Sequence, residues 1–416
     1  MNRMMGAALD QTDPLRDIAD RFHFPETADG NRPIYFTGNS LGLMPKKARE
    51  YVNQELEDWS RFAVEGHFHA RHPWLPYHEF LTEQMANVIG AMPIETVVMN
   101  SLTINLHLLM VSFFKPTRER SFVMIEKGAF PSDQYAVESQ MRCHGLDPRK
   151  FLIELTPRES EATLRTEDIV AKIEKYNGQI AMIMLGVVNY YTGQAFDMEA
   201  ITAAGHKAGA MVGFDLAHAA GNILLKLHDW DVDFAVWCSY KYLNAGPGAV
   251  GGAFVHERHA RSFDLCRLAG WWGHDKETRF LMGAEFKPLA GAEGWQVSNP
   301  PILQMAALRA SLEIFEEVGM AVLREKSEKL TGYLESLLDD IAGDRISVIT
   351  PRDPAHRGCQ LSIRVKGGDK SLHERLVARG VFADWREPDV IRVAPVPLYN
   401  SFTDVRRFAR ILADCI

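Results

Sequence analysis

Short apolar runs rich in valine, isoleucine and methionine alternate with longer segments of helical period between about residues 79 and 260. This alternation is typical of parallel strands that are joined by crossover helices. We therefore expect an α/β domain with a mainly parallel sheet. The expected strands are 96–99, 121–126, 180–188, 211–214, 234–238 and 249–255, and the clearest helices are 132–144, 169–176 and 199–209.

The pattern changes after residue 301 and predicts a smaller α+β domain. Its expected elements are a long amphipathic segment at 302–341 that is interrupted near Gly319, strands at 346–349, 361–365 and 390–393, a helix at 370–379 and a closing helix from Thr403. A chain of 416 residues is too long for one ordinary core. We expect a large domain at 63–300, a C-terminal domain at 301–416, and an N-terminal segment at 1–62 that packs across both and carries a helix at 46–62.

Composition and charge exclude several classes of partner. The chain is 46% hydrophobic and 24% charged, with a formal net charge of -8 and no block of lysine and arginine. This balance gives no attraction to nucleic acid or anionic lipid, and no apolar run is long enough to span a membrane. The five cysteines are scattered and never spaced as Cys-x-x-Cys, which argues against disulfides and zinc knuckles. We expect a cytoplasmic protein.

Two residues at predicted strand ends indicate a cofactor site. Asp215 ends an apolar run, and Lys241 follows the next expected strand, between Tyr240 and Tyr242. An acid in this position is often only a helix N-cap, and a lone lysine after a strand is usually solvated. However, adjacent parallel strands would bring both side chains to one edge of the sheet. An acid and a lysine there suit a pyridine cofactor, because the acid keeps the ring nitrogen protonated while the lysine forms an imine.

A phosphate site is also predicted, where Ser101, Leu102 and Thr103 open a helix after the first strand. Helix-start amides and hydroxyls bind anions, although an isolated serine here is more often a simple N-cap. Phe130 precedes another strand-to-helix turn and would stack on a flat ring, unless it is a core aromatic.

The histidines at 67, 69 and 72 lack the spacing and carboxylate support of a zinc site. The Gly-Pro-Gly at 246–248 is not a dinucleotide loop, since it lacks the strand-glycine-helix context.

With these motifs in order, the chain resembles the kynureninase family of fold-type-I pyridoxal-phosphate hydrolases. The resemblance runs from about residue 37 to residue 402. It rests on Thr-Gly-Asn-Ser-Leu-Gly at 37–42, Phe-Pro-Ser-Asp at 130–133, Phe-Asp-Leu-Ala-His at 214–218, Cys-Ser-Tyr-Lys-Tyr-Leu-Asn at 238–244, Trp-Trp-Gly-His at 271–274, Ser-Asn-Pro-Pro at 298–301 and Arg-Val-Ala-Pro-Val-Pro-Leu-Tyr at 392–399.

The resemblance implies a set of cofactor contacts. Lys241 would form the imine with pyridoxal 5'-phosphate, Asp215 would pair with the pyridinium nitrogen, and Phe130 would stack on the ring. Leu102 and Thr103 would meet the phosphate. The remaining implied cofactor shell consists of Pro131, Ser132, Asp133, His218 and Tyr240.

The resemblance also implies a homodimer with shared active sites, because Trp271 and Asn299 match residues that reach the cofactor across the dimer interface. Arg392 would clamp the substrate carboxylate through its bidentate fork. His67, Asn299 and Ser40 would border the aromatic end of the substrate. One departure is Gly186, where some relatives have a serine in the cofactor shell, which puts that contact in doubt.

The implied reaction is hydrolysis of L-kynurenine or 3-hydroxy-L-kynurenine to L-alanine and anthranilate or 3-hydroxyanthranilate, in tryptophan degradation or NAD biosynthesis. Lys241 would take the Cα proton and Tyr240 would protonate Cβ. Other fold-type-I enzymes, such as a cysteine desulfurase or a class V aminotransferase, share the aspartate and lysine. A cofactor-fold protein that has lost its activity and serves as a binding module is a further alternative, although Lys241, Asp215 and Arg392 argue against it.

Overall fold

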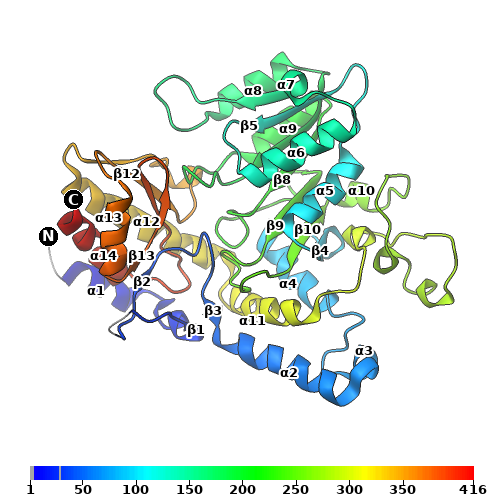
Figure 1. Ribbon diagram of the computed structural model, residues 1–416, viewed down its shortest axis with the longest axis horizontal. Helices are drawn as coiled ribbons and strands as arrows, with labels where there is room; N and C mark the ends of the chain where they lie inside the picture. Colours follow the sequence, from blue (N-terminus) through cyan, green and yellow to red (C-terminus); the bar gives the residue numbers. More distant parts are fainter. Residues whose placement is uncertain (1–3, 28–29) are drawn as a thin grey trace.

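The computed structural model describes residues 4–27 and 30–416. Its larger part is built on a seven-stranded sheet in the order β4-β10-β9-β8-β7-β5-β6 (Figure 1). Neighbouring strands run parallel, except that β10 is antiparallel to both β9 and β4. The strands are β4 (Thr96–Val98), β5 (Phe122–Glu126), β6 (Leu152–Leu155), β7 (Ile180–Gly186), β8 (Met211–Asp215), β9 (Phe234–Cys238) and β10 (Gly251–Val255).

Both faces of this sheet are buried, which explains why its strands are almost continuously apolar. In β7, Ile183 and Leu185 belong to one hydrophobic core, whereas Met182 and Met184 belong to the other. The first core also takes buried residues from α4 (Glu79–Ile89), α8 (Thr166–Lys175), α9 (Met198–Lys207) and α11 (Ile302–Val318). The second takes them from α5 (Leu102–Phe113) and α6 (Pro131–Cys143). The short helices nearby are α7 (Pro148–Phe151) and α10 (Glu257–Ala260).

The expected strands and helices of this sheet are confirmed to within a few residues, but three details were wrong. The strand β6 was not predicted, because its four residues are too few to show a period. Strand β10 is antiparallel to β9, and the connection at 239–250 contains turns and no helix. Strands β8 and β9 are parallel neighbours as expected, yet the connection at 216–233 contains turns and no helix.

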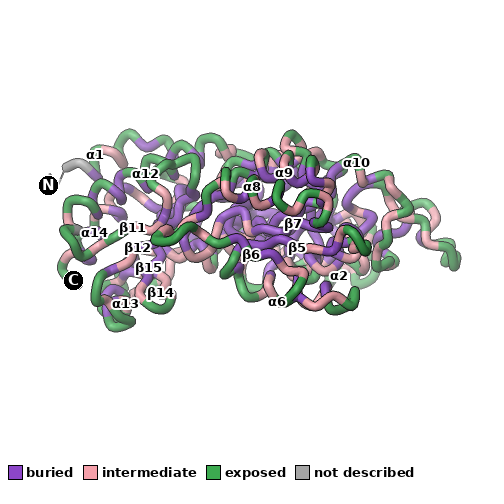
Figure 2. The backbone as a smooth tube through the Cα atoms, turned by 90° about the horizontal axis from the view of Figure 1, so that it is seen from above, coloured by how far each residue is buried: buried purple, intermediate pink, exposed green. Residues whose placement is uncertain are grey.

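The C-terminal part has its own antiparallel sheet, in the order β11-β12-β15-β14. Its strands are β11 (Ile346–Val348), β12 (Leu361–Val365), β14 (Asp384–Arg386) and β15 (Val390–Val393), and its helices are α12 (Met320–Ala342), α13 (Lys370–Ala378) and α14 (Phe402–Cys415). A separate hydrophobic core lies between them. Figure 2 shows the two interiors as separate groups of buried positions.

The break expected near Gly319 is confirmed, and it separates α11 from α12. Helix α11 packs into the core of the large sheet. Leu323 at the start of α12 also belongs to that core, whereas Leu330 belongs to the smaller one. We therefore propose that the boundary between the two domains lies inside α12, and not at residue 301.

The N-terminal segment contacts both parts of the molecule. Strand β2 (Ile34–Tyr35) pairs in parallel with β13 (Val381–Phe382) of the C-terminal part. Helix α2 (Lys46–Phe62) runs along α11, and α1 (Met4–Thr12) lies beside α14 (Figure 1). The remaining elements are the paired strands β1 (Phe22–His23) and β3 (Met44–Pro45), and the helix α3 (Gly66–His69). In the part of the chain that the structure describes, no helix is long and apolar enough to cross a membrane.

Candidate functional site

Three adjacent strands end in a row at the carboxyl edge of the large sheet. The last residues of β5, β7 and β8 are Glu126, Gly186 and Asp215, and Gly186 is in register with Asp215. The next strand, β9, ends at Cys238, and Tyr240 and Lys241 follow it after Ser239. Because ligands of parallel sheets bind at this edge, the row defines a candidate site.

A pocket opens above this row. The residues that line it are Leu102, Thr103, Glu126, Phe130, Ser132, Asp133, Gly186, Val188, Tyr190, Asp215, Ala217, His218, Tyr240 and Lys241.

Two helix starts converge on one side of the pocket. Helix α5 begins at Leu102 and α6 at Pro131, and the hydroxyls of Thr103 and Ser132 lie 2.9 Å apart. The N-cap of α5 is Ser101, but its side chain makes no capping hydrogen bond. The first amides of α5 therefore have no capping side chain, as an anion site at a helix start requires.

Acidic groups crowd the same pocket. Asp215 accepts a hydrogen bond from the Ala217 amide at 2.6 Å, and it shares one with Asp133. Burial raises the pKa of Asp215, although the charge of Lys241 opposes this. Burial and the neighbouring Asp215 raise the pKa of Asp133 well above its usual range. The simple N-cap role for Asp215 is excluded, because no helix follows it in the connection to β9.

Lys241 lies between the acids and two aromatic rings. Its Nζ is 5.9 Å from the centre of the Phe130 ring and 5.8 Å from that of Tyr240. Phe130 is 46% exposed and is therefore not a core aromatic. Burial raises the pKa of the Tyr240 phenol. Burial also lowers the pKa of His218 well below its usual value, and Lys241 adds to this effect.

These residues fit pyridoxal phosphate. Buried polar atoms normally have partners, yet His218 Nδ1 and Asp133 Oδ1 have none among the residues that the structure describes. A pyridine ring with polar substituents would satisfy such atoms. The helix starts suit the phosphate, and the acids suit a protonated ring nitrogen. Lys241 lies where it would meet the aldehyde.

Besides Pro131, five predicted site residues lie outside the lining of this pocket. Ser40 donates a hydrogen bond to Asp384 at 3.4 Å, and the Nδ1 of His67 contacts the Val64 carbonyl at 2.9 Å. Trp271, at the start of a short 3-10 helix, is 43% exposed. The other two are Arg392 and the exposed Asn299. Pro131, the first residue of α6, does not line the pocket either.

Arg392 is held at the junction between the two parts of the molecule. It is 1% exposed, donates to the Tyr190 carbonyl at 2.6 Å and pairs with Asp384. Burial lowers its pKa to about 10. Tyr190 itself lines the pocket, so this hydrogen bond ties strand β15 to the pocket wall.

Glu126 was not predicted as a site residue, although its sequence pattern is the one that identified Asp215. Both are acids that end a buried strand of the parallel sheet. Glu126 is 4% exposed and lines the pocket beside Gly186. Its position after Val-Met-Ile would have identified it had the same rule been applied to every strand.

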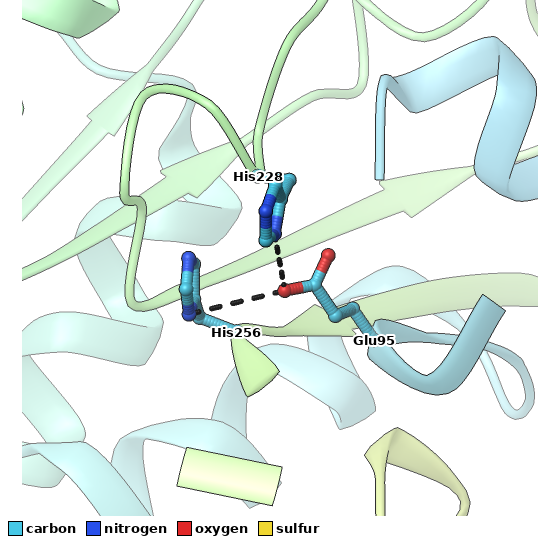
Figure 3. A group of neighbouring side chains, drawn as sticks. All are labelled: Glu95, His228 and His256. Carbon is cyan, nitrogen blue, oxygen red and sulfur yellow. Dashed lines mark hydrogen bonds and ion pairs between the residues drawn. The ribbon is translucent and has the colours of Figure 1, made fainter. Parts of the chain in front are cut away.

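A second group of ionisable residues lies at the opposite edge of the sheet (Figure 3). The carboxylate of Glu95 accepts a hydrogen bond from His228 Nδ1 at 3.0 Å, and it lies 3.8 Å from His256 Nδ1. Its Oε1 also accepts from the Glu257 amide, and His256 Nδ1 accepts from the Arg258 amide. These hydrogen bonds occupy lone pairs that a metal ion would need, so the group is a hydrogen-bonded cluster.

The same edge holds Asp233, which directly precedes β9. Its carboxylate contacts His206 Nε2 at 2.9 Å and His259 Nε2 at 2.7 Å. It also accepts from Arg258 at 2.6 Å and from the Val212 amide at 2.7 Å. Burial favours the neutral acid, but these hydrogen bonds outweigh burial and lower the pKa of Asp233.

Solved structures show the class of fold. A cysteine desulfurase from Escherichia coli superposes with a TM-score of 0.77 at 15% identity, over 96% of this chain and 97% of that one. A C-DES variant with glycine covalently linked to its PLP cofactor gives a TM-score of 0.75 at 16% identity, over 91% and 96%. The fold is that of the fold-type-I pyridoxal-phosphate enzymes.

Sequence comparison identifies the family. The kynureninase of Koribacter versatilis is 61% identical over 402 residues, which are 97% of this chain and 95% of that protein. The model of the kynureninase C-terminal domain matches residues 323–412. The chain therefore belongs to the kynureninase family, as its motifs indicated.

Proposed function

We propose which residue carries out each part of kynurenine hydrolysis in this pyridoxal-phosphate-dependent enzyme. The reaction takes place in the Lys241 pocket. The proposal rests on one observation. Asp215 ends β8 and Lys241 follows the adjacent parallel strand β9, in one pocket with the two helix starts, in a chain that is 61% identical to a kynureninase.

When bound, the cofactor supplies an electron sink that makes the substrate Cα–H acidic and permits cleavage of the Cβ–Cγ bond. Lys241 holds the cofactor and moves the Cα proton. Asp215 accepts a hydrogen bond from the protonated ring nitrogen and so keeps that nitrogen positively charged. Leu102 and Thr103 bind the phosphate through the start of α5, and Phe130 covers one face of the ring.

Tyr240 and Arg392 act on the substrate. The raised pKa of the Tyr240 phenol keeps its proton at neutral pH, as a donor to Cβ requires. Arg392 binds the substrate carboxylate, with its guanidinium oriented by the Tyr190 carbonyl and Asp384. His67, Ser40 and Asn299 border the aromatic end of the substrate.

Lys241→Ala tests the proposal. Turnover of kynurenine should fall by roughly a thousandfold or more, because the proton carrier and the covalent anchor are both lost. The visible absorbance of the bound cofactor should change as well. Lys226→Ala, an exposed lysine on the β8–β9 connection, should leave both unchanged. Substantial multiple turnover by Lys241→Ala would contradict the assignment.

A cysteine desulfurase shares the fold, but the cysteines argue against that activity. Burial raises the pKa of Cys238 to about 11 and that of Cys359 to about 12, so neither is a ready thiolate. No cysteine lines the pocket among the described residues. All five cysteines are unpaired, which supports a cytoplasmic location.

We further propose a homodimer with shared active sites. Trp271 and Asn299 lie outside the pocket, and exposed apolar side chains follow Trp271 at Phe280, Leu281 and Met282. An exposed apolar patch of this kind suits a subunit interface.

Mixed dimers test the sharing directly. When inactive Lys241→Ala and Trp271→Ala proteins are mixed and reassembled, each mixed dimer regains one intact site. Activity should return to about a quarter of the wild-type value if the subunits mix statistically. Absence of any regain, in mixtures shown by mass to contain mixed dimers, would contradict a shared site.

The preferred substrate is a separate question, since a pocket discriminates one hydroxyl strongly only where it makes dedicated hydrogen bonds. We propose that His67 and Asn299 admit 3-hydroxykynurenine as well as kynurenine. The ratio of kcat/KM for the two substrates, measured for the wild type and His67→Ala, tests this.

A further inference from the structure

Glu126 is a buried acid of the pocket that none of the proposed steps uses. It ends strand β5, it is 4% exposed, and no described lysine, arginine or histidine forms an ion pair with it. Both carboxylate oxygens face the main-chain amide of Gly186, at 3.2 and 3.4 Å. Burial disfavours the charged form of this acid, and no ion pair among the described residues offsets that cost in free energy.

Gly186 makes room for this carboxylate. A Cβ atom at Gly186 would lie 3.0 Å from Glu126 Oε1, closer than most Cβ contacts allow. A side chain there would crowd the carboxylate that reaches across from β5 to β7. Glu126 and Gly186 therefore form one unit at the edge of the sheet.

The charged groups that face this unit come from several elements. The charge of Asp215 on β8 raises the pKa of Glu126, and the charge of Glu126 raises the pKa of Asp133 on α6. Burial raises the pKa of Glu126 to about 7, and the neighbouring Asp215 adds to the rise. The other titratable groups that line the same pocket are Tyr190, His218, Tyr240 and Lys241.

We propose that Glu126 is a positioning residue that acts through Asp215: its carboxylate, held by the Gly186 amide, strengthens the binding of the ring-nitrogen proton of the cofactor at Asp215. This rests on the proposed function, in which Asp215 holds that nitrogen. A second negative charge beside Asp215 stabilises a nearby positive charge, so proton loss from the bound cofactor requires a higher pH.

The test is a pH titration of the visible absorbance of the holoenzyme, compared between wild type and Glu126→Gln. Removing the charge should lower the midpoint of the cofactor transition by about 0.5–1 pH unit. The pH profile of kcat should lose its inflection near 7, while KM stays within about twofold. The matched control is Glu154→Gln on the neighbouring strand β6, whose exposed side chain should leave the midpoint unchanged.

A second variant keeps the test decisive if Glu126→Gln does not fold. Gly186→Ala pushes the carboxylate away without removing it, so the midpoint should move in the same direction by a smaller amount. A midpoint within about 0.2 pH unit of wild type in either folded variant would overturn the role of Glu126. If the wild type itself showed no cofactor band, the proposed function would fail instead.

Discussion

Two groups of buried acids lie near opposite ends of strand β9. They differ in how many hydrogen bonds and positive charges surround their carboxylates. Asp233, just before the strand, has two histidines, an arginine and a main-chain amide around it, and its pKa is lowered. Near the other end, Asp215 and Asp133 share a hydrogen bond, with Lys241 as the nearby positive charge, and their pKa values are raised. The acid of the first cluster is surrounded by donors and cations, whereas the acids of the second face one another with only Lys241 to balance their charge.

The difference shows where a ligand belongs. Buried charges are normally paired, so a structural cluster such as that of Asp233 satisfies itself. The acids of the Lys241 pocket are crowded instead, which suits a ligand that brings a positive charge. Buried acids with raised pKa values in a pocket are therefore candidates for a functional cluster.

The largest effect is expected for Asp215→Asn, which removes the charge that the functional cluster offers to the ring nitrogen. The rate constant kcat should fall by about 10²–10³-fold, because a neutral ring is a weaker electron sink. Cofactor binding and kcat are the measurements. Asp229→Asn, an exposed residue of the same connection, is the control. If kcat stayed within about threefold of wild type, Asp215 would not hold the nitrogen.

The matching change in the structural cluster is Asp233→Asn. It should lower the free energy of unfolding by about 3 kcal/mol, because Arg258 and two histidines lose a buried partner. Urea unfolding measures this, and kcat of the folded enzyme should be unchanged. A large fall in kcat with unaltered stability would reverse the roles of the two clusters.

The pH dependence of the cofactor-free protein sharpens the comparison. The folded pKa of Glu126, about 7, exceeds its ordinary 4.5, so its contribution to stability is present below 4.5 and lost as pH rises through 7. Stability should therefore decrease by roughly 2 kcal/mol between pH 5 and 8. Thermal melts with and without pyridoxal phosphate should show greater stabilisation by the cofactor at pH 8 than at pH 5.5. An equal effect at both values would argue against crowded acids.

The smallest effect is expected at His228, whose pKa is raised by its hydrogen bond to Glu95. Its contribution is present below the ordinary value of about 6.5 and is lost as pH rises through the raised value. Its side chain is 33% exposed, so solvent screens the pair and His228→Gln should cost less than about 1 kcal/mol. Urea unfolding at pH 6 and 8.5 should show the loss only at pH 6, whereas His69→Gln, an exposed control, should show none at either pH.

Much of the fold was predictable because its signals are local. Strand β9 and helix α2 have the predicted bounds, since their apolar patterns end at clear polar or turn residues. The direction of β10 was not predictable from period alone, because a strand reads the same in either direction. The pairing of β10 with β9 in the folded chain shows the direction.

The site residues also differ in whether a local sequence signal predicts them. Asp215, Lys241 and the helix start at Leu102 were found because each has a local signal at a strand or helix end. Arg392 was placed by resemblance, and the structure brings it to Tyr190, which lies 202 residues away in sequence. Glu126 beside Gly186 is a contact between strands, which a reading of one segment at a time does not show.

The sequence by itself determined the α/β class and the family, and it predicted an acid and a lysine for the site, because periodicity and motifs are properties of neighbouring residues. Only the tertiary structure decided which acids share a pocket and which are paired with histidines. Asp215 and Asp233 each lie beside an apolar strand in the sequence. Burial and long-range partners, which depend on the packing of the whole chain, place one in the cofactor pocket and the other in a completed ion-pair cluster.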